Sequence, residues 1–483
     1  MSTSNESDLH QLSATELVLM LRARQVSARE VVADHLGQVE RWNPVVNAIV
    51  TLTAEQALEA AAAADQAAAR GDLLGPLHGL PTAHKDLQDT RGVRTTYGSP
   101  LFAEHVPDAD SLLVERVRAA GAISLGKTNV PEFGAGSQTY NAVFGETRNP
   151  WDPRMTPGGS SGGAAAALAA RMVPLADGSD LGGSLRNPAS FCNVVGLRPS
   201  AGLVPSWPSA DAYFPLPVDG PMARTVADVA LLLSVLAGFD ARDPRAWPGD
   251  GDRFARAALT PGGLDVDTRG LRVAWWPRPD GLPVDRRVVE VLERDGRAAL
   301  EQLGAQLVDA GPDLRGADRV FRVLRAWQFA AAHRETYQRH RDRLGDSVAW
   351  NVEQGLDLTG AEVADAFRGR TEIHARTLAF LADVDVIAMP VSQVPPFPVE
   401  QRWITEIDGQ ELSTYLDWMA SCYLVTVTGL PAVSVPCGFT DDGLPVGLQL
   451  VGRPQGELEL LRVAHMVELA TGASRREPAL PSS

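Results

Sequence analysis

Residues 158–186 have the sequence GGSSGGAAAALAARMVPLADGSDLGGSLR, which indicates how the rest of the chain is organised. It contains two segments rich in glycine and serine, GGSSGG at 158–163 and DLGGS at 180–184, joined by an alanine-rich run. Glycine permits sharp turns, so each segment predicts a tight loop that leaves a serine hydroxyl uncovered. Ser160 and Ser184 are therefore the first candidates for catalytic residues.

Lysine is rare in this chain. Of 44 basic residues only Lys85, in HGLPTAHKD, and Lys127, in GKTN, are lysines, and arginine takes the other positions. Arginine stays charged at any biological pH, whereas burial can make a lysine amine neutral and able to accept a proton. We therefore assign Lys85 as a candidate base, Ser160 as a proton relay and Ser184 as a nucleophile. Lys127 is expected to be structural.

These segments strongly resemble the amidase signature family of serine hydrolases. The motifs that carry the resemblance are residues 158–186 and their continuation NPASFCNVVGLRPSAGLVP, HGLPTAHKDLQDTRGVRTTYGS before them and GPMARTVADVALLL after them. Weaker similarity extends over most of the chain, and the part around 254–383 is the least diagnostic. The resemblance places the family's lysine at Lys85, its cis-serine at Ser160 and its acylated serine at Ser184. It also implies a cis peptide bond between Gly159 and Ser160.

The resemblance implies an α/β fold, with one compact domain in which a mixed central β-sheet is flanked by α-helices on both sides. The sequence pattern agrees, because candidate strands alternate with candidate helices. The strands are expected at 122–126, 271–275, 384–389 and 432–437, and the helices at 111–120, 226–237 and 287–303.

The first 70 residues are expected to form a helical segment that packs on the core. Ser13 with Glu16 and Ser27 with Glu30 have the spacing of capping boxes, and the alanine-rich run 57–70 predicts a third helix. Residues 71–483 are then the amidase signature domain, and the two parts form one structural unit overall.

Composition excludes several classes of protein. With 45% hydrophobic and 22% charged residues, the chain of 483 residues has the composition of a soluble globular protein. A net charge of −16 and the lack of a basic cluster argue against a nucleic-acid partner. No signal peptide or membrane span is predicted, and three isolated cysteines, Cys192, Cys422 and Cys437, suit reduced thiols. We expect a cytoplasmic protein, monomeric or homodimeric, without a metal or other cofactor.

Hydrolysis of an amide also needs a site that stabilises the negative charge on the carbonyl oxygen. Gly182 and Gly183 allow the backbone to turn, so the N–H groups of Leu181, Gly182, Gly183 and Ser184 are predicted to form an oxyanion hole. Ser161 is expected to support the relay. Asp180 and Arg186 flank the turn and are expected to fix it through hydrogen bonds.

Plainer interpretations exist for these motifs. GGSSGG before an alanine run also fits the start of a helix capped by serine, and a phosphate-binding loop would need lysine where Ala164 stands. His84, next to Lys85, is expected to pack against the loop and not to act as a base. The pair Trp275 and Trp276 is expected to pack and not to form a platform for a ligand.

Three functions remain open from the sequence. The first is hydrolysis of a small or aryl amide, or of a carbamate, through an acyl-enzyme. The second is the A subunit of a glutamine-dependent tRNA amidotransferase, and the third is a catalytically silent binding protein. In related hydrolases the segment with Gly134, Ala135 and Gly136 approaches the acylated serine. These small residues predict room for a bulky acyl or carbamoyl group.

Overall fold

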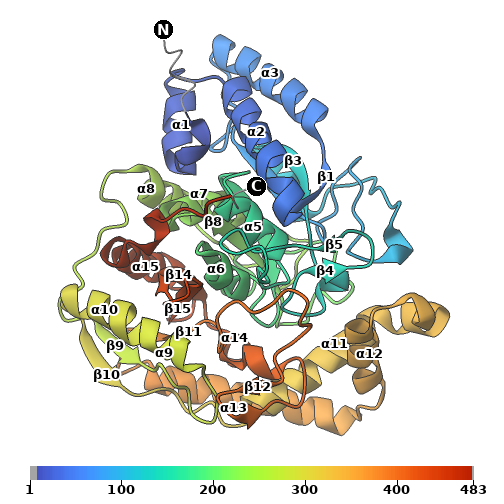
Figure 1. Cartoon of the computed structure of the whole chain (residues 1–483), viewed down its shortest axis with the longest axis vertical. Helices are drawn as coiled ribbons and strands as arrows, with labels where there is room; N and C mark the ends of the chain where they lie inside the picture. Colours follow the sequence, from blue (N-terminus) through green and yellow to red (C-terminus); the bar gives the residue numbers. More distant parts are fainter. Residues whose placement is uncertain (1–7, 481–483) are drawn as a thin grey trace.

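The alternating strands and helices build one large mixed sheet, which the computed structural model shows at the centre of the molecule (Figure 1). The structure describes residues 8–480. The strand order is β1-β3-β2-β6-β8-β7-β14-β15-β11-β9-β10. The bounds are β1 Ile49–Leu52, β2 Pro81–Lys85, β3 Ile123–Thr128, β6 Leu175–Asp180, β7 Val195–Arg198, β8 Val218–Ala223, β9 Arg272–Trp275, β10 Gln306–Asp309, β11 Val386–Pro390, β14 Ala432–Phe439 and β15 Pro445–Val451.

The pairing of the central strands places the two sequence motifs side by side. β2 runs parallel to β3 and to β6, whereas β6 and β8 are antiparallel. β2 and β6 therefore end at the same edge of the sheet, β2 with Lys85 and β6 with Asp180. The turn with Ser184 follows directly. Two short hairpins lie outside this sheet: β4 Tyr140–Asn141 with β5 Gly145–Glu146, and β12 Glu406–Ile407 with β13 Gln410–Glu411.

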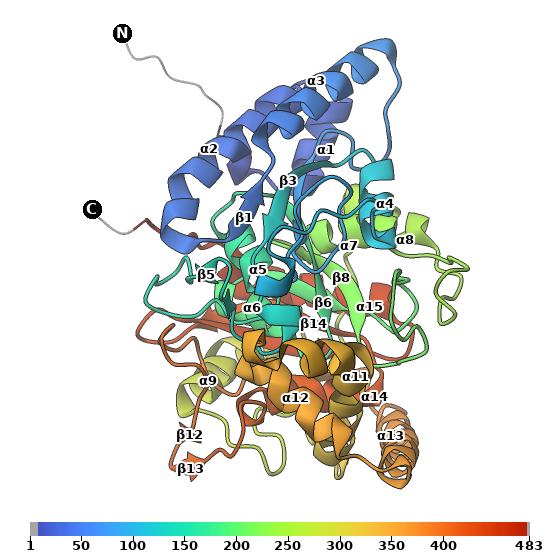
Figure 2. The same ribbon diagram turned by 90° about the vertical axis from the view of Figure 1, so that its right-hand side faces the viewer.

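Helices flank the sheet. α5 and α6 pack on each other and on the central strands, and α7 and α15 form a second pair that also packs on them. α1 to α3 lie at one end of the molecule and α11 to α13 at the other (Figures 1 and 2). The bounds are α1 Ala14–Arg22, α2 Ala28–Val46, α3 Ala54–Arg70, α4 Leu112–Ala119, α5 Gly162–Ala169, α6 Arg186–Cys192, α7 Val226–Leu236, α8 Gly251–Leu259, α9 Arg286–Val291, α10 Ala298–Gln302, α11 Ala317–His340, α12 Asp346–Leu356, α13 Gly360–Phe380, α14 Ala420–Thr428 and α15 Glu457–Thr471.

The predicted α/β fold and its individual elements are confirmed, with two differences. Both capping boxes form, and the alanine-rich helix is α3. The helix expected at 287–303 contains a π-helical turn at Leu292–Arg297 between α9 and α10. The stretch before residue 70 also contains a strand, β1, which pairs with β3 at the edge of the sheet. Its hydrogen bonds explain why this part of the chain is not helical throughout.

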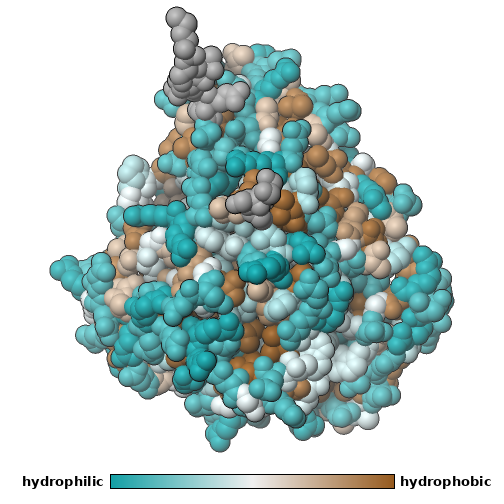
Figure 3. Space-filling model, viewed as in Figure 1, coloured by the Kyte–Doolittle hydropathy of each residue, from teal (hydrophilic) through white to brown (hydrophobic). Residues whose placement is uncertain are grey.

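The surface and the core differ as the composition predicts. Hydrophilic residues cover most of the face that Figure 3 shows. β14 and β15 are buried along their whole lengths. The three cysteines are free and buried, and Trp275 and Trp276 both belong to the core. Within residues 8–480, no helix has the length and apolar character that crossing a membrane requires.

A buried ion pair fixes the turn between β6 and α6. Arg186 donates to both carboxylate oxygens of Asp180 at 2.9 Å, and Arg198 donates to the backbone oxygen of Asp180 at 2.6 Å. Burial opposes ionisation of Asp180, but Arg186 and Arg198 together hold its pKa well below the usual range. Arg186 also donates to the Cys422 carbonyl and to Gln449, which ties the turn to α14 and β15. This confirms the predicted hydrogen bonds.

Removing this carboxylate is expected to destabilise the protein, because it leaves buried arginines without a counter-ion. Asp180→Asn should lower the free energy of unfolding by about 3–5 kcal/mol, measured by urea denaturation with tryptophan fluorescence. Asp267→Asn is the matched control, because Asp267 pairs with Arg269 on the surface. Exposed pairs contribute little, so the control should unfold like the wild type. An equal effect of both substitutions would contradict this role of the buried pair.

Candidate active site

Lys85, the last residue of β2, lies at the centre of a buried cluster of hydroxyl groups. Its side chain is fully buried, and its Nζ donates to Ser160 Oγ at 2.8 Å, to Ser161 Oγ at 2.9 Å and to Ser179 Oγ at 2.9 Å. Burial lowers the pKa of Lys85 to about 7, although nearby aspartates, Asp219 first among them, raise it. The amine can therefore exchange a proton near neutral pH.

The first glycine-serine loop brings Ser160 and Ser161 to Lys85 just before α5. The peptide bond between Gly159 and Ser160 is cis, as the resemblance implies. A side chain at Gly159 would have its Cβ 2.8 Å from the Gln138 backbone nitrogen, so only glycine fits this close approach. Ser161 donates its backbone N–H to the Ser184 carbonyl at 3.3 Å, which joins this loop to the second one.

The second loop places Ser184 in the sharp turn between β6 and α6. Gly183 has a φ of +119°, and a Cβ there would lie 2.4 Å from Cys422 Cβ, so the turn requires glycine. Ser184 is 9% exposed, which leaves it within reach of a small molecule at the edge of the cluster. The hydrogen bond between Ser161 and Ser184 therefore places the turn with Ser184 beside the loop in which Ser160 contacts Lys85.

The backbone N–H groups of the second loop differ in whether they have a hydrogen-bond acceptor within the protein. The Gly183 N–H donates to Asp180 Oδ1 at 2.8 Å. It is therefore occupied, whereas the sequence predicted that all four N–H groups would form the oxyanion hole. The cause is the buried Asp180 carboxylate, which also accepts the Leu185 N–H. Among residues 8–480, the N–H groups of Leu181, Gly182 and Ser184 have no acceptor. These three remain available to a ligand.

His84 and Lys127 have structural surroundings. His84 Nδ1 is 2.5 Å from Asp177 Oδ2, and the other oxygen of Asp177 accepts the Lys85 backbone N–H at 3.0 Å. Lys127 donates to Thr90 Oγ1 at 2.8 Å and to the Gln88 carbonyl. These partners hold His84 against the sheet and Lys127 against the chain after β2.

Sequence reasoning missed Ser179, the third hydroxyl that accepts from Lys85. Ser179 lies on β6, and its side chain is half-buried beside the lysine. A signal was present in the sequence, because Ser179 stands immediately before Asp180 in the same motif. Recognising its role required the pairing of β2 with β6.

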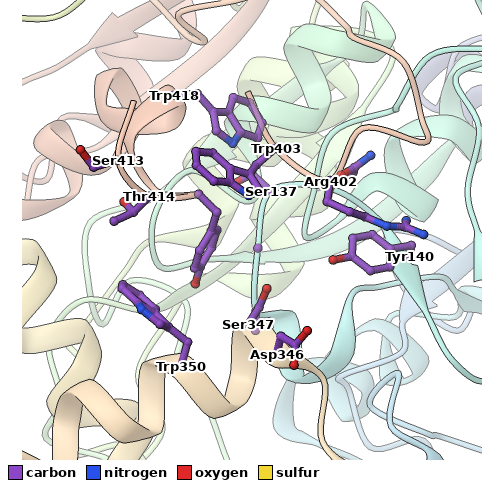
Figure 4. A pocket seen from close by; sticks show the side chains of 14 residues that line it. Ser137, Tyr140, Asp346, Ser347, Trp350, Arg402, Trp403, Ser413, Thr414 and Trp418 are labelled. Carbon is purple, nitrogen blue, oxygen red and sulfur yellow. The ribbon is translucent and has the colours of Figure 1, made fainter. Parts of the chain in front are cut away.

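A cavity of about 370 Å³ is lined in part by the residues that follow Gly134 (Figure 4). Ala135 and Gly136 line it, whereas a Cβ on Gly134 would lie 3.4 Å from Ser160 Oγ. Gly134 therefore borders the serine itself, and the next two residues border the cavity. The remaining lining residues are Ser137, Gln138, Tyr140, Asp346, Ser347, Trp350, Arg402, Trp403, Ser413, Thr414, Tyr415 and Trp418.

Aromatic rings dominate the cavity wall. Trp350, on α12, makes an edge contact with Tyr415, with ring centroids 5.6 Å apart. The Arg402 guanidinium lies 4.1 Å from the centroid of the Tyr140 ring, and its Nη1 donates to Glu146. The long chain segment after β11 and the helices after β10 thus provide most of the wall.

Comparisons with known proteins agree with this geometry. The Amidase family model matches residues 30–461. An acylamidase from Rhodococcus erythropolis is 36% identical over 479 residues, which covers 98% of each chain. The A subunit of the glutamyl-tRNA(Gln) amidotransferase from Chloroflexus aurantiacus is 37% identical over 499 residues, covering 98% of this chain and 99% of that protein.

Solved structures give the same result. A bacterial aryl acylamidase of the amidase signature family superposes with a TM-score of 0.89 at 28% identity, covering 98% of this chain and 100% of that one. A peptide amidase from Stenotrophomonas maltophilia superposes with a TM-score of 0.80 at 29% identity, covering 97% and 99%. The sequence match over most of the chain and the shared fold lead to one conclusion: this protein belongs to the amidase signature family of amide hydrolases.

Proposed function

We propose that this enzyme hydrolyses the C–N bond of a small or aryl amide through an acyl-enzyme on Ser184. The observation that carries the proposal is the 2.8 Å hydrogen bond between Lys85 Nζ and Ser160 Oγ, beside the turn with Ser184. Burial lowers the pKa of the lysine to about 7, so an amine that ordinarily stays charged can act as a base near neutral pH.

Each step has a residue to carry it. Neutral Lys85 accepts a proton from Ser160, and Ser160 takes the proton of Ser184 as the Ser184 oxygen attacks the carbonyl carbon. The proton then returns through Ser160 to the leaving nitrogen as the C–N bond breaks. Water then attacks the acyl carbon and gives a proton to Ser160 by the same relay. The C–O bond to Ser184 breaks, the Ser184 oxygen takes the proton back from Ser160, and the acid is released. A hydroxyl suits the relay because it both donates and accepts.

The turn after β6 supplies the charge stabilisation in this proposal. The N–H groups of Leu181, Gly182 and Ser184 are the donors for the oxyanion, because Asp180 occupies that of Gly183. Loss of one such donor typically costs about 3 kcal/mol of transition-state stabilisation.

The cavity favours an aromatic group on the substrate. Trp350, Trp403, Tyr415 and Trp418 line it, and such rings bind other rings through stacked or edge contacts. The small residues Gly134, Ala135 and Gly136 form the passage from this cavity to Ser160 in the proposal. Similarity to an aryl acylamidase over the whole chain supports the same substrate class.

A role in a tRNA amidotransferase is the second candidate, because A subunits of such enzymes match the chain at 37% identity over nearly its full length. A glutaminase reaction that appears only with a partner protein would support it. Hydrolysis of anilides by the purified chain alone would support the amidase.

Ser184→Ala should abolish turnover of an anilide, because the variant has no nucleophile, while the fold is kept. The measurement is release of the aniline, with circular dichroism to verify folding. Mass spectrometry of the wild type with an activated ester should place the acyl group on Ser184. Activity above about a tenth of the wild-type value would remove Ser184 from this role, since deletion of a nucleophile normally costs far more.

Lys85→Arg should be nearly as damaging as Lys85→Ala, because a permanent cation cannot accept the proton. The pH profile of the wild type follows from the same group. The reactive form of Lys85 is the neutral amine, so kcat/KM should rise with pH and level off above the pKa of about 7. Substantial activity of Lys85→Arg, or a flat profile between pH 6 and 9, would contradict the assignment.

Trp350→Ala should weaken binding of an anilide, because one wall of the aromatic cavity is lost. An aromatic contact contributes about 1 kcal/mol, so KM should rise roughly fivefold. Acetamide does not fill the cavity and should keep its kinetic constants. Trp350→Phe retains a ring and is the matched control. Equal losses on both substrates would show that Trp350 supports the fold and does not select the substrate.

A further inference from the structure

A second cavity borders Ser179 on β6 and Asp219 on β8. It has a volume of about 260 Å³, and polar side chains dominate its lining: Gln88, Asp89, Ser111, Ser179, Ser206 and Asp219. None of the residues that line the aromatic cavity borders it. Ser179 is the link to the active site, because its Oγ accepts the hydrogen bond from Lys85 Nζ at 2.9 Å.

The register of the sheet places a carboxylate beside this link. Ser179 on β6 is directly opposite Asp219 on β8 in the antiparallel ladder. Directly opposed residues project their side chains on the same face, with Cβ atoms about 5 Å apart. Asp219 is 9% exposed, and its two oxygens accept from Gln88 Nε2 at 2.8 Å and from the Ser206 hydroxyl. Burial raises the pKa of Asp219, whereas these two donors and Lys85 favour its ionised form.

Asp219, unlike Asp180, has only neutral hydrogen-bond partners among residues 8–480, namely Gln88 and Ser206. Asp180 is paired with Arg186 and Arg198, and on the same strand Asp177 contacts His84. The remaining groups are Asp86, which accepts from Thr96 and lies near Lys127, and Lys127 itself on β3. The charge of Asp219 is therefore the least compensated of these carboxylates.

We propose that Asp219, opposite Ser179 in the sheet, is a positioning residue whose charge stabilises the protonated amine of the candidate base Lys85. This role rests on the proposed function, in which Lys85 exchanges a proton during each acyl transfer. Burial alone would drive the amine toward the neutral form so strongly that it would hold the proton poorly. Asp219 offsets this effect, which agrees with its place as the largest attractive charge on Lys85.

The two lysines of this chain make a direct test possible. Protein labelled with 13C at lysine Cε gives only two such signals, and Lys85→Met assigns them. Asp219→Asn should lower the measured pKa of Lys85 by about one unit, because an opposite charge is lost at short range. The pKa of Lys127 should stay in place. In the active enzyme, the acid limb of kcat/KM should move by the same amount.

Asp89→Asn is the matched control. Asp89 lines the same cavity, but it lies near Lys127 and helps to raise the pKa of that lysine. This variant should lower the pKa of Lys127 and leave that of Lys85 unchanged. Asp219→Ser removes the same charge with a smaller polar side chain and should also lower the pKa of Lys85, which decides the matter if Asp219→Asn does not fold.

An unchanged pKa of Lys85 in folded Asp219→Asn, or an equal shift in Asp89→Asn, would overturn the role of Asp219. If Asp219→Asn does not fold, an unchanged pKa of Lys85 in Asp219→Ser overturns it. Because the titration observes the amine itself, it does not depend on turnover. Activity of Lys85→Arg would instead overturn the proposed function and leave the effect of Asp219 on the amine measurable.

Discussion

Burial of the Lys85 amine away from water determines which groups have to surround it in this site. A buried ammonium is costly, so Lys85 holds a proton only as far as its partners repay the lost hydration. Three hydroxyls do so, two from the loop before α5 and one from β6. Each comes from a segment that the sheet holds rigidly, and the amine is therefore poised between its two protonation states.

The buried charge of Asp180, unlike that of Lys85, is compensated by side chains of opposite charge. Asp180, in the same turn as Ser184, is fully paired with Arg186 and Arg198 and stays ionised. Asp180 thus keeps its charge and holds the turn, whereas Lys85 can change its protonation state near neutral pH.

The sequence was sufficient for the parts of the site that depend on local geometry. Glycine at Gly183 and paired serines before a helix reveal tight turns, and the rarity of lysine draws attention to Lys85. Ser179 and Asp219 could not be found this way, since they meet across strands some 40 residues apart and only the antiparallel register makes them neighbours. The occupied N–H of Gly183 depends likewise on where the Asp180 side chain turns.

The residues that line the aromatic cavity come from different chain segments than the candidate catalytic residues. The candidate catalytic residues lie at the end of β2 (Lys85), after β6 (Ser184) and just before α5 (Ser160). The cavity wall comes instead from connections and helices around 135–140, 346–350 and 402–418. Loops tolerate substitution better than a buried sheet does. The wall can therefore change to admit another substrate without disturbing the hydrogen bonds of Lys85, whereas a change at Gly159 or Gly183 would displace a catalytic loop.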